Sequence, residues 1–249
     1  TQDASGNSFS IDGLTLNTDG SFSFDPSNPS YNSLKDGQSQ SLTINYVAKD
    51  DQGLNSDVQS FNINVLGTND APTATYTTAD VIDASGSALA PQEGGDSVSG
   101  QLTSSDVDAS GNPTYSLVGS SIPGLTLSSD GSWTFDPTNS AYNQLQGGQK
   151  QTIDVDYAVT DDKGASADGS FSITLTGTND APTATYTTNL SALEGASSIS
   201  GQLTSSDVDA SGAPSFFLSD ASGNTQDASG NSFSIDGLTL NTDGSFSFD

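Results

Sequence analysis

The sequence predicts an all-β protein made of tandem β-sandwich domains. Short segments alternate apolar and polar residues with a period of two, which is typical of half-buried strands. Turn signals separate these segments, and similar blocks of about 110 residues recur along the chain. About seven short strands in a block of this length favour an immunoglobulin-like architecture. No segment keeps a helical period over three turns.

The expected strands follow one another in the same order in two parts of the chain. In the first part, the alternating apolar positions are Leu14 and Leu16, then Phe22 and Phe24, then Leu42, Ile44 and Tyr46, then Phe61, Ile63 and Val65. Their downstream counterparts are Leu125 and Leu127, then Trp133 and Phe135, then Ile153, Val155 and Tyr157, then Phe171, Ile173 and Leu175. The first two strands of each set are joined by an Asp-Gly dipeptide, at Asp19-Gly20, Asp130-Gly131 and Asp243-Gly244. Asp-Gly favours a tight hairpin because Gly accepts a positive φ.

Aromatic residues at matching positions are expected in the core. Trp133 aligns with Phe22 and Phe246, so core packing is its first interpretation and a sugar-stacking platform is the alternative. Tyr31 and Tyr142, in the matching segments SYNSL and AYNQL, are also expected to pack inside.

Internal repeats set the expected domain boundaries. Residues 1–25 recur unchanged at 225–249, an offset of 224, and GTNDAPTATYTT occurs at both 67–78 and 177–188. With GTNDAP as the boundary, residues 71–180 are one complete repeat domain. Residues 1–70 are then the C-terminal part of a repeat, and residues 181–249 are the N-terminal part of the next. The open edges of such part-domains are expected to be adhesive unless a neighbouring molecule pairs with them.

Composition excludes most catalytic chemistry. The chain has no Cys, Met or His, which removes thiol nucleophiles, imidazole bases and the usual zinc ligands. Its 31 acidic residues against 4 lysines give a net charge of -27. Such a charge makes nucleic acids and anionic membranes poor partners. The apolar runs are also too short for a transmembrane helix.

The carboxylates are ordered by repeat rather than scattered. Glu occurs only at Glu93 and Glu194, which share one repeat position. The other clusters are Asp106 with Asp108, Asp207 with Asp209, Asp50 with Asp51, Asp161 with Asp162, Asn69 with Asp70, and Asn179 with Asp180. Paired carboxylates repel unless protons or cations lie between them, and an all-oxygen set of ligands suits Ca²⁺ better than Mg²⁺. The sequence therefore predicts calcium as the bound ion.

Chain geometry predicts that the calcium ligands gather at two places. The extended segment SVSGQLT separates Glu93 from Asp106, and an extended chain rises about 3.3 Å per residue. These two residues are therefore expected at opposite poles of one sandwich. Asp106 and Asp108 should face the Asn69-Asp70 linker, while Glu93 should face the Asn179-Asp180 linker. An EF-hand is excluded, because the twelfth positions after Asp106 and Asp207 are Leu117 and Leu218.

The order of TDDKG, a closing strand, GTNDAPT, an EG dipeptide, SGQLTSSDVDASG and DGSWTFDP resembles the VCBS repeat family. It is similar, more loosely, to cadherin-like domains. The resemblance covers essentially the whole chain. It implies tandem immunoglobulin/cadherin-like Greek-key β-sandwich domains with calcium at the linkers. It also implies a module of large, RTX-type bacterial adhesins or biofilm proteins at the cell surface or outside the cell.

By position, the resemblance implies two sets of calcium ligands. The first junction would use Asn69, Asp70, Asp106, Asp108 and Asp161, with Asp162 as a neighbour. The second would use Glu93, Asn179, Asp180, Asp207 and Asp209. The remaining metal candidates, Asp50, Asp51 and Glu194, need domain parts outside this chain.

The first expected function is structural: a segment of an extracellular adhesin or filament for cell adhesion or biofilm, stiffened by calcium between domains. Its expected partners are calcium, neighbouring repeats and, through other regions, a host or cell surface, with self-association into filaments left open. The alternative is a module that binds glycans or another surface ligand through Trp133 or the inserted loop 219–231. An enzyme is not expected, because the Asp pairs recur at every repeat boundary, as scaffold ligands should.

Overall fold

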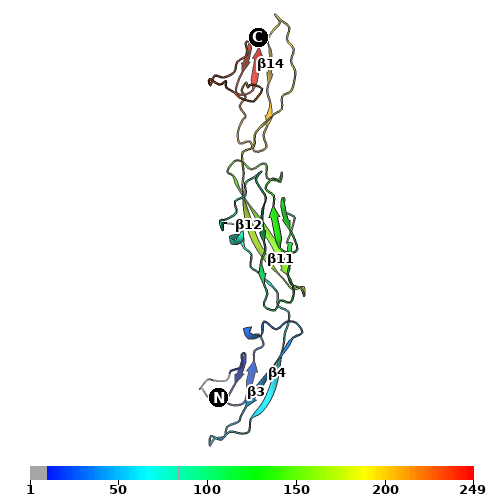
Figure 1. Cartoon of the computed structure of the whole chain (residues 1–249), viewed down its shortest axis with the longest axis vertical. Coiled ribbons are helices and arrows are strands. Elements are labelled where there is room, and N and C mark those ends of the chain that lie inside the picture. Colours follow the sequence, from blue (N-terminus) through cyan, green and yellow to red (C-terminus); the bar gives the residue numbers. More distant parts are fainter. Residues whose placement is uncertain (1–9, 83–84) are drawn as a thin grey trace. The chain divides into compact units, whose positions relative to one another are not determined.

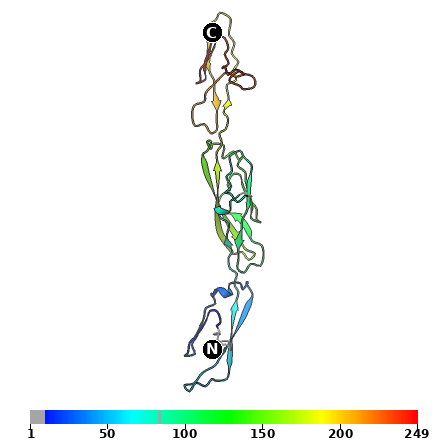
Figure 2. The same ribbon diagram turned by 60° about the vertical axis from the view of Figure 1, so that its left-hand side comes forward.

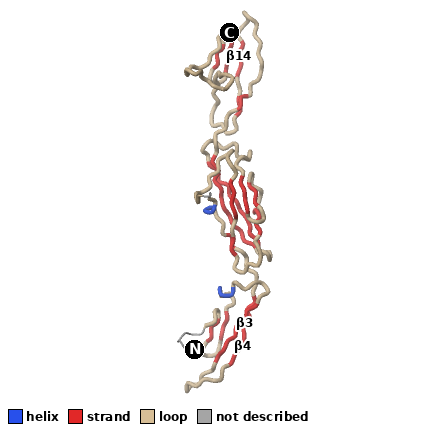
Figure 3. The backbone as a smooth tube through the Cα atoms, viewed as in Figure 1, coloured by secondary structure: helices blue, strands red, loops and turns tan. Residues whose placement is uncertain are grey.

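A computed structural model of the chain describes residues 10–82 and 85–249, and almost all of its regular structure is β (Figures 1 and 3). The only helices in the described residues are two three-residue 3₁₀ turns, Pro29–Tyr31 (η1) and Thr78–Asp80 (η2). The all-β prediction is therefore confirmed. The first nine residues of the repeated 25-residue segment lie outside the described residues.

The first strands are Leu14–Leu16 (β1), Phe22–Phe24 (β2), Ser39–Tyr46 (β3) and Gln59–Leu66 (β4). They form two antiparallel pairs, β1 with β2 and β3 with β4. All four strands lie where the alternating apolar residues predict them. Phe61 on β4 lies beside Phe22 on β2, with ring centroids 5.0 Å apart.

Strands of the middle part are Thr73–Ala74 (β5), Val98–Gln101 (β6), Ser104–Ser105 (β7), Thr114–Leu117 (β8), Leu125–Leu127 (β9), Ser132–Phe135 (β10), Lys150–Thr160 (β11) and Ser166–Thr176 (β12). Two three-stranded sheets have the orders β6-β10-β9 and β12-β11-β8, and β5 pairs with β7. In Figure 2, as in Figure 1, the long strands β11 and β12 run side by side.

The core of the middle part lies between these sheets. Trp133 on β10 is 1% exposed, and its ring centroid lies 5.1 Å from that of Phe171 on β12. Tyr31 and Tyr142 are buried as well. The packing interpretation of these aromatic residues is therefore confirmed. The alternative role of Trp133 as a sugar-stacking platform is wrong, because its indole has almost no accessible surface.

The last strands are Thr183–Ala184 (β13), Ile199–Gln202 (β14), Ser205–Ser206 (β15), Leu238–Leu240 (β16) and Ser245–Phe248 (β17). They form a three-stranded sheet, β14-β17-β16, and the pair β13-β15. In each of the three Asp-Gly hairpins, the Gly alone has a positive φ, as at Gly20 with φ 88°. The Asp instead accepts hydrogen bonds from the Ser that follows the Gly, so each loop is a three-residue turn with Gly in the left-handed position.

The chain separates into two compact units. One contains residues 1–88, 99–134 and 154–172, and the other contains residues 89–98, 135–153 and 173–249. The repeat-based boundaries at residues 70 and 180 stay a prediction. Among the described residues, no helix is long and apolar enough to cross a membrane.

Candidate functional site

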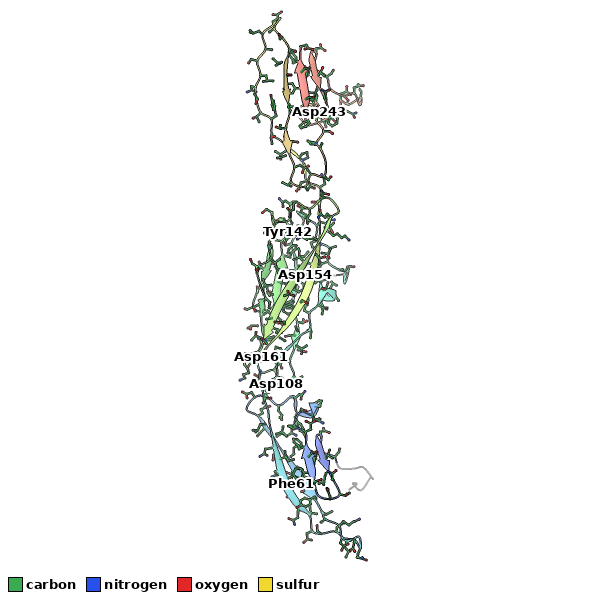
Figure 4. The ribbon with its side chains drawn as sticks, turned by 180° about the vertical axis from the view of Figure 1, so that it is seen from behind. Phe61, Asp108, Tyr142, Asp154, Asp161 and Asp243 are labelled. Carbon is green, nitrogen blue, oxygen red and sulfur yellow. The ribbon has the colours of Figure 1, made fainter. Side chains whose placement is uncertain are left out.

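A first group of polar residues gathers where three segments of the chain meet. We call Asn69, Asp70, Asp106, Asp108 and Asp161 the first cluster. Asp106 and Asp108 follow the short strand β7, and Asp161 follows β11 directly. The Asn69 amide donates a hydrogen bond of 2.8 Å to Asp161 Oδ2, and the Asp70 N–H donates one of 3.3 Å to Asp108 Oδ2. Strand ends and the linker after β4 therefore bring the five residues together. Figure 4 shows Asp108 and Asp161 near each other.

The buried carboxylates of the first cluster have few hydrogen-bond donors or positive charges near them. Asp108 is 4% exposed, and its Oδ1 atom is buried without a hydrogen-bond partner. Burial raises the pKa of Asp106, and the charges of Asp108 and Asp161 raise it further. The Asn69 hydrogen bond, by contrast, lowers the pKa of Asp161. A cavity of about 100 Å³ lined by Asp106 and Asp161 opens beside the cluster, which is room for more than one water-sized particle.

A second group, which we call the second cluster, contains Glu93, Asn179, Asp180, Asp207 and Asp209. Glu93 is held at its main chain, where its N–H donates to the Thr176 carbonyl over 2.9 Å. The Thr178 N–H donates to Glu93 Oε2 over 3.2 Å, and the Asp180 N–H donates to Asp209 Oδ2 over 3.3 Å. Asp180 and Asp209 thus repeat the arrangement of Asp70 and Asp108 in the first cluster. Asn179 differs from Asn69, because its amide donates to the Asp180 carbonyl and it is exposed.

Three carboxylate oxygens of the second cluster are buried without a hydrogen-bond partner: Glu93 Oε1, Asp207 Oδ1 and Asp209 Oδ1. Burial raises the pKa of Glu93, and the nearby charges of Asp180 and Asp209 add to this rise. The neighbouring Asp209 side chain is the main cause that raises the pKa of Asp207, and burial raises it further. The cluster therefore favours a proton or a cation between its carboxylates.

The chemistry of both clusters fits a hard cation. Buried carboxylate oxygens without a donor are costly, and oxygen-only ligands are what Ca²⁺ accepts. In the described residues, however, no three His, Cys, Asp or Glu side chains are spaced closely enough to hold a metal ion together. Mutual repulsion of the carboxylates opposes such a spacing. Small side-chain movements would have to bring them around one ion.

The other candidate ligands lie apart from the two clusters. Asp162 Oδ2 accepts a hydrogen bond of 2.7 Å from Ser110, so it lies beside the first cluster with a partner of its own. Asp50 Oδ1 accepts hydrogen bonds from the N–H groups of its own turn, and Asp51 and Glu194 are exposed. In the inserted loop, Asp220 and Asp227 are likewise bound within their own turns.

Two contacts at these clusters escaped prediction from sequence. Thr178 binds Glu93 twice, because its hydroxyl also donates to the Glu93 carbonyl over 3.2 Å. The recurrence of GTNDAP, which contains Thr178, was the sequence signal that could have identified this residue. Lys35 Nζ donates a hydrogen bond of 2.6 Å to the Ala109 carbonyl, within the SDVDASG loop. No sequence signal identifies Lys35, because the corresponding residue of the central repeat is Gln146.

Comparison with known proteins supports the fold of the middle part. Residues 69–174 match the model of the bacterial Ig domain family. No curated protein matches the sequence.

Solved structures of cadherins resemble the chain at low identity. The human CDH23 EC21-23 structure is 15% identical, with 99% of this chain and 75% of that chain covered and a TM-score of 0.49. Drosophila N-cadherin EC1-4 is 12% identical, with 96% and 56% covered and a TM-score of 0.42. The protocadherin GammaB4 extracellular domain is 16% identical at a TM-score of 0.42, and the 96% of this chain that is covered spans 38% of that domain. None of these similarities bears on what this chain binds.

Proposed function

We propose that this chain is a structural segment of an extracellular bacterial adhesin or filament, in which calcium bound at the two clusters stiffens successive repeats. The observation that carries the proposal is the set of buried, unpartnered carboxylate oxygens on Glu93, Asp108, Asp207 and Asp209. Two of them, Asp108 and Asp209, occupy matching repeat positions, as ligands of a repeated ion site would. The resemblance to VCBS repeats supports a role in adhesion or biofilm, with neighbouring repeats and a host or cell surface as partners.

Each cluster would hold calcium through its carboxylates and linker residues. Asp106, Asp108, Asp161 and the Asn69-Asp70 linker would supply the first set of oxygens, and Glu93, Asp207, Asp209 and the Asn179-Asp180 linker the second. A bound divalent cation supplies the positive charge that these carboxylates lack. The hydrogen bonds from Asn69, Thr178 and the linker N–H groups hold some carboxylates in place beforehand, which lowers the cost of ordering them on binding.

The test of stiffening is small-angle X-ray scattering with calcium and with a chelator. Calcium should narrow the distribution of dimensions of the wild-type chain, because neutralised carboxylates fix the linkers. The double variant Asp106→Asn and Asp108→Asn should lose part of that response. Asp156→Asn with Asp168→Asn is the matched control, because it removes the same charge from two exposed residues away from the clusters. Equal calcium responses in the cluster variant and the wild type would contradict the proposal.

Glu93→Gln should change stability in opposite directions with and without calcium. In chelator near pH 7, removing a charge that lies buried near Asp180 and Asp209 is expected to stabilise the fold, because burial and these charges disfavour the ionised form of Glu93. With calcium, the same change removes a proposed ligand and should therefore destabilise the fold. Urea unfolding in both conditions measures the two effects. Glu194→Gln, at the same repeat position but exposed, should change neither. A Glu93→Gln effect of the same sign and size in both conditions would exclude Glu93 as a ligand.

A further inference from the structure

Lys35 joins the first part of the chain to the loop that carries Asp106 and Asp108. It lies between η1 and β3, and its ammonium group donates a hydrogen bond of 2.6 Å to the Ala109 carbonyl. Lys35 and Ala109 are 74 residues apart and belong to the same compact unit. Ala109 directly follows the buried Asp108. A positive charge of the protein itself therefore lies next to the first cluster.

The main chain around Lys35 is fixed to the linker of the first junction. The Lys35 N–H donates to Gln38 Oε1 over 3.0 Å, and the Gly67 N–H donates to the Gln38 carbonyl over 2.9 Å. Gly67 begins the GTND linker and lies so close to the carbonyls of Leu34 and Lys35 that a Cβ atom would clash with them. The base of the Lys35 side chain is thus held at the start of the linker, while its tip reaches Ala109 beyond it.

The second junction repeats this main-chain arrangement without the lysine. Gln146 takes the place of Lys35. The Gln146 N–H donates to Gln149 Oε1 over 3.1 Å, and the Gly177 N–H donates to the Gln149 carbonyl over 2.7 Å. Gln146 is exposed, whereas Lys35 is half-buried. Gln146 and Ala210, the counterpart of Ala109, belong to the other compact unit, and none of the hydrogen bonds found among the described residues joins them.

The acidic loops of the two junctions have one sequence, SDVDASG, at 105–111 and 206–212. In the first loop one Asp oxygen is buried without a hydrogen-bond partner, Asp108 Oδ1. In the second loop there are two, Asp207 Oδ1 and Asp209 Oδ1. A nearby positive charge favours ionised carboxylates, and only the first loop has a lysine bound to it. The second junction therefore has the greater need for a cation from solution.

We propose that Lys35 is an intramolecular tether that restrains the first junction without calcium, so that calcium controls the second junction more strongly than the first. This inference rests on the proposed function in one respect, namely that calcium at the clusters fixes successive repeats. The ammonium group binds a carbonyl across the linker and brings a charge that does not depend on the calcium concentration. A charge-assisted hydrogen bond of this kind is stronger than a neutral one, which is what Gln146 at most could form.

Spin labels on introduced cysteines measure each junction separately in the full chain. The chain has no cysteine, so Thr43→Cys with Thr126→Cys reports the first junction, and Thr126→Cys with Thr239→Cys reports the second. All three residues are exposed on strands. Double electron–electron resonance in chelator gives the distribution of distances for each pair. Lys35→Gln should raise the population outside the main peak of the first distribution about threefold, as loss of one exposed hydrogen bond would. Gln146→Lys should lower that population in the second distribution by a similar factor.

Two further variants separate the tether from general charge effects. Lys49→Gln removes the same charge from an exposed lysine beyond the other end of β3, and it should leave the first distribution unchanged. Lys35→Arg keeps the charge and the donor, and it should keep the wild-type distribution. A first distribution that Lys35→Gln leaves unchanged, or that Lys49→Gln broadens equally, would overturn the tether. An unchanged second distribution in Gln146→Lys would overturn the claim that this one side chain distinguishes the junctions.

The same measurements with calcium distinguish failure of the tether from failure of the proposed function. Calcium should narrow the second distribution more than the first, and it should return Lys35→Gln towards the wild type. If calcium changes neither distribution, the proposed function fails, while a broader first distribution for Lys35→Gln in chelator still supports the tether. If calcium narrows both distributions equally and Lys35→Gln matches the wild type in chelator, the tether is wrong and the proposed function stands.

Discussion

Chelation of calcium should lower the thermal unfolding midpoint of the domain around Trp133 by about 10 °C or more. Calcium at a concentration about 100-fold above its Kd stabilises the folded state by about 2.7 kcal/mol. The unfolding midpoint of a domain of about 100 residues shifts by roughly 4–8 °C for each kcal/mol of stability. Trp133 is the only tryptophan and is 1% exposed, so its fluorescence reports the unfolding of this domain alone.

Magnesium and the cluster variants distinguish a specific site from general charge screening. Mg²⁺ retains its bound waters and requires octahedral geometry. After chelation of calcium, it should therefore restore only a small part of the lost unfolding midpoint. Asp106→Asn with Asp108→Asn should reduce the calcium-dependent shift, while Asp156→Asn with Asp168→Asn should retain it. Coincident curves in calcium and chelator would contradict calcium binding and leave the clusters as solvated turns. An equal effect of Mg²⁺ at the same concentration would assign the stabilisation to screening of the net charge of -27.

Local signals in the sequence were sufficient to predict the strands that carry alternating apolar residues and the Asp-Gly hairpins, but not short strands such as β5 and β7. Each alternating apolar set coincides with a strand, because burial of one face is imposed by the side chains within a few residues. The Asp-Gly loops were predictable for the same reason, since a left-handed residue is needed where only glycine fits well. The Asp keeps a negative φ and accepts hydrogen bonds from the Ser that follows the Gly. This detail depends on the loop length, which cannot be predicted from the dipeptide alone.

The neighbours of the candidate ligands were less predictable, because they are set by contacts between distant parts of the chain. Asn69 and Asp161 are 92 residues apart, and repeat alignment placed them in one group only through family resemblance. The contact of Lys35 with the Ala109 carbonyl has no counterpart in the next repeat, so repetition could not indicate it. Burial of Asp108 and Glu93 was also beyond sequence reasoning, since an acidic residue is ordinarily placed at the surface.

Gly100→Ala is expected to destabilise the same domain by about 2–4 kcal/mol, which is in the range of overpacked core sites. A Cβ atom at Gly100 would lie 2.6 Å from two carbon atoms of the Trp133 indole. The ring cannot move away easily, because Phe171 lies 5.1 Å away on one side and Tyr76 lies at 6.5 Å. The added methyl group must therefore displace strand β6 or move the Trp133 side chain away from its packed position. Urea unfolding monitored by Trp133 fluorescence measures the loss.

The control for this change is Gly212→Ala, and because Gly212 lies outside the domain that Trp133 reports, its unfolding is followed by circular dichroism. Gly212 has no atom within 4 Å of the position of a new Cβ, and its φ is not positive. The added methyl group should therefore be neutral or slightly stabilising, because alanine has less conformational freedom than glycine in the unfolded chain. If Gly100→Ala were as mild as Gly212→Ala, the close packing of Trp133 against β6 would be wrong. A large loss confined to Gly100→Ala would mean that glycine is required here for the approach of the indole and not for backbone flexibility.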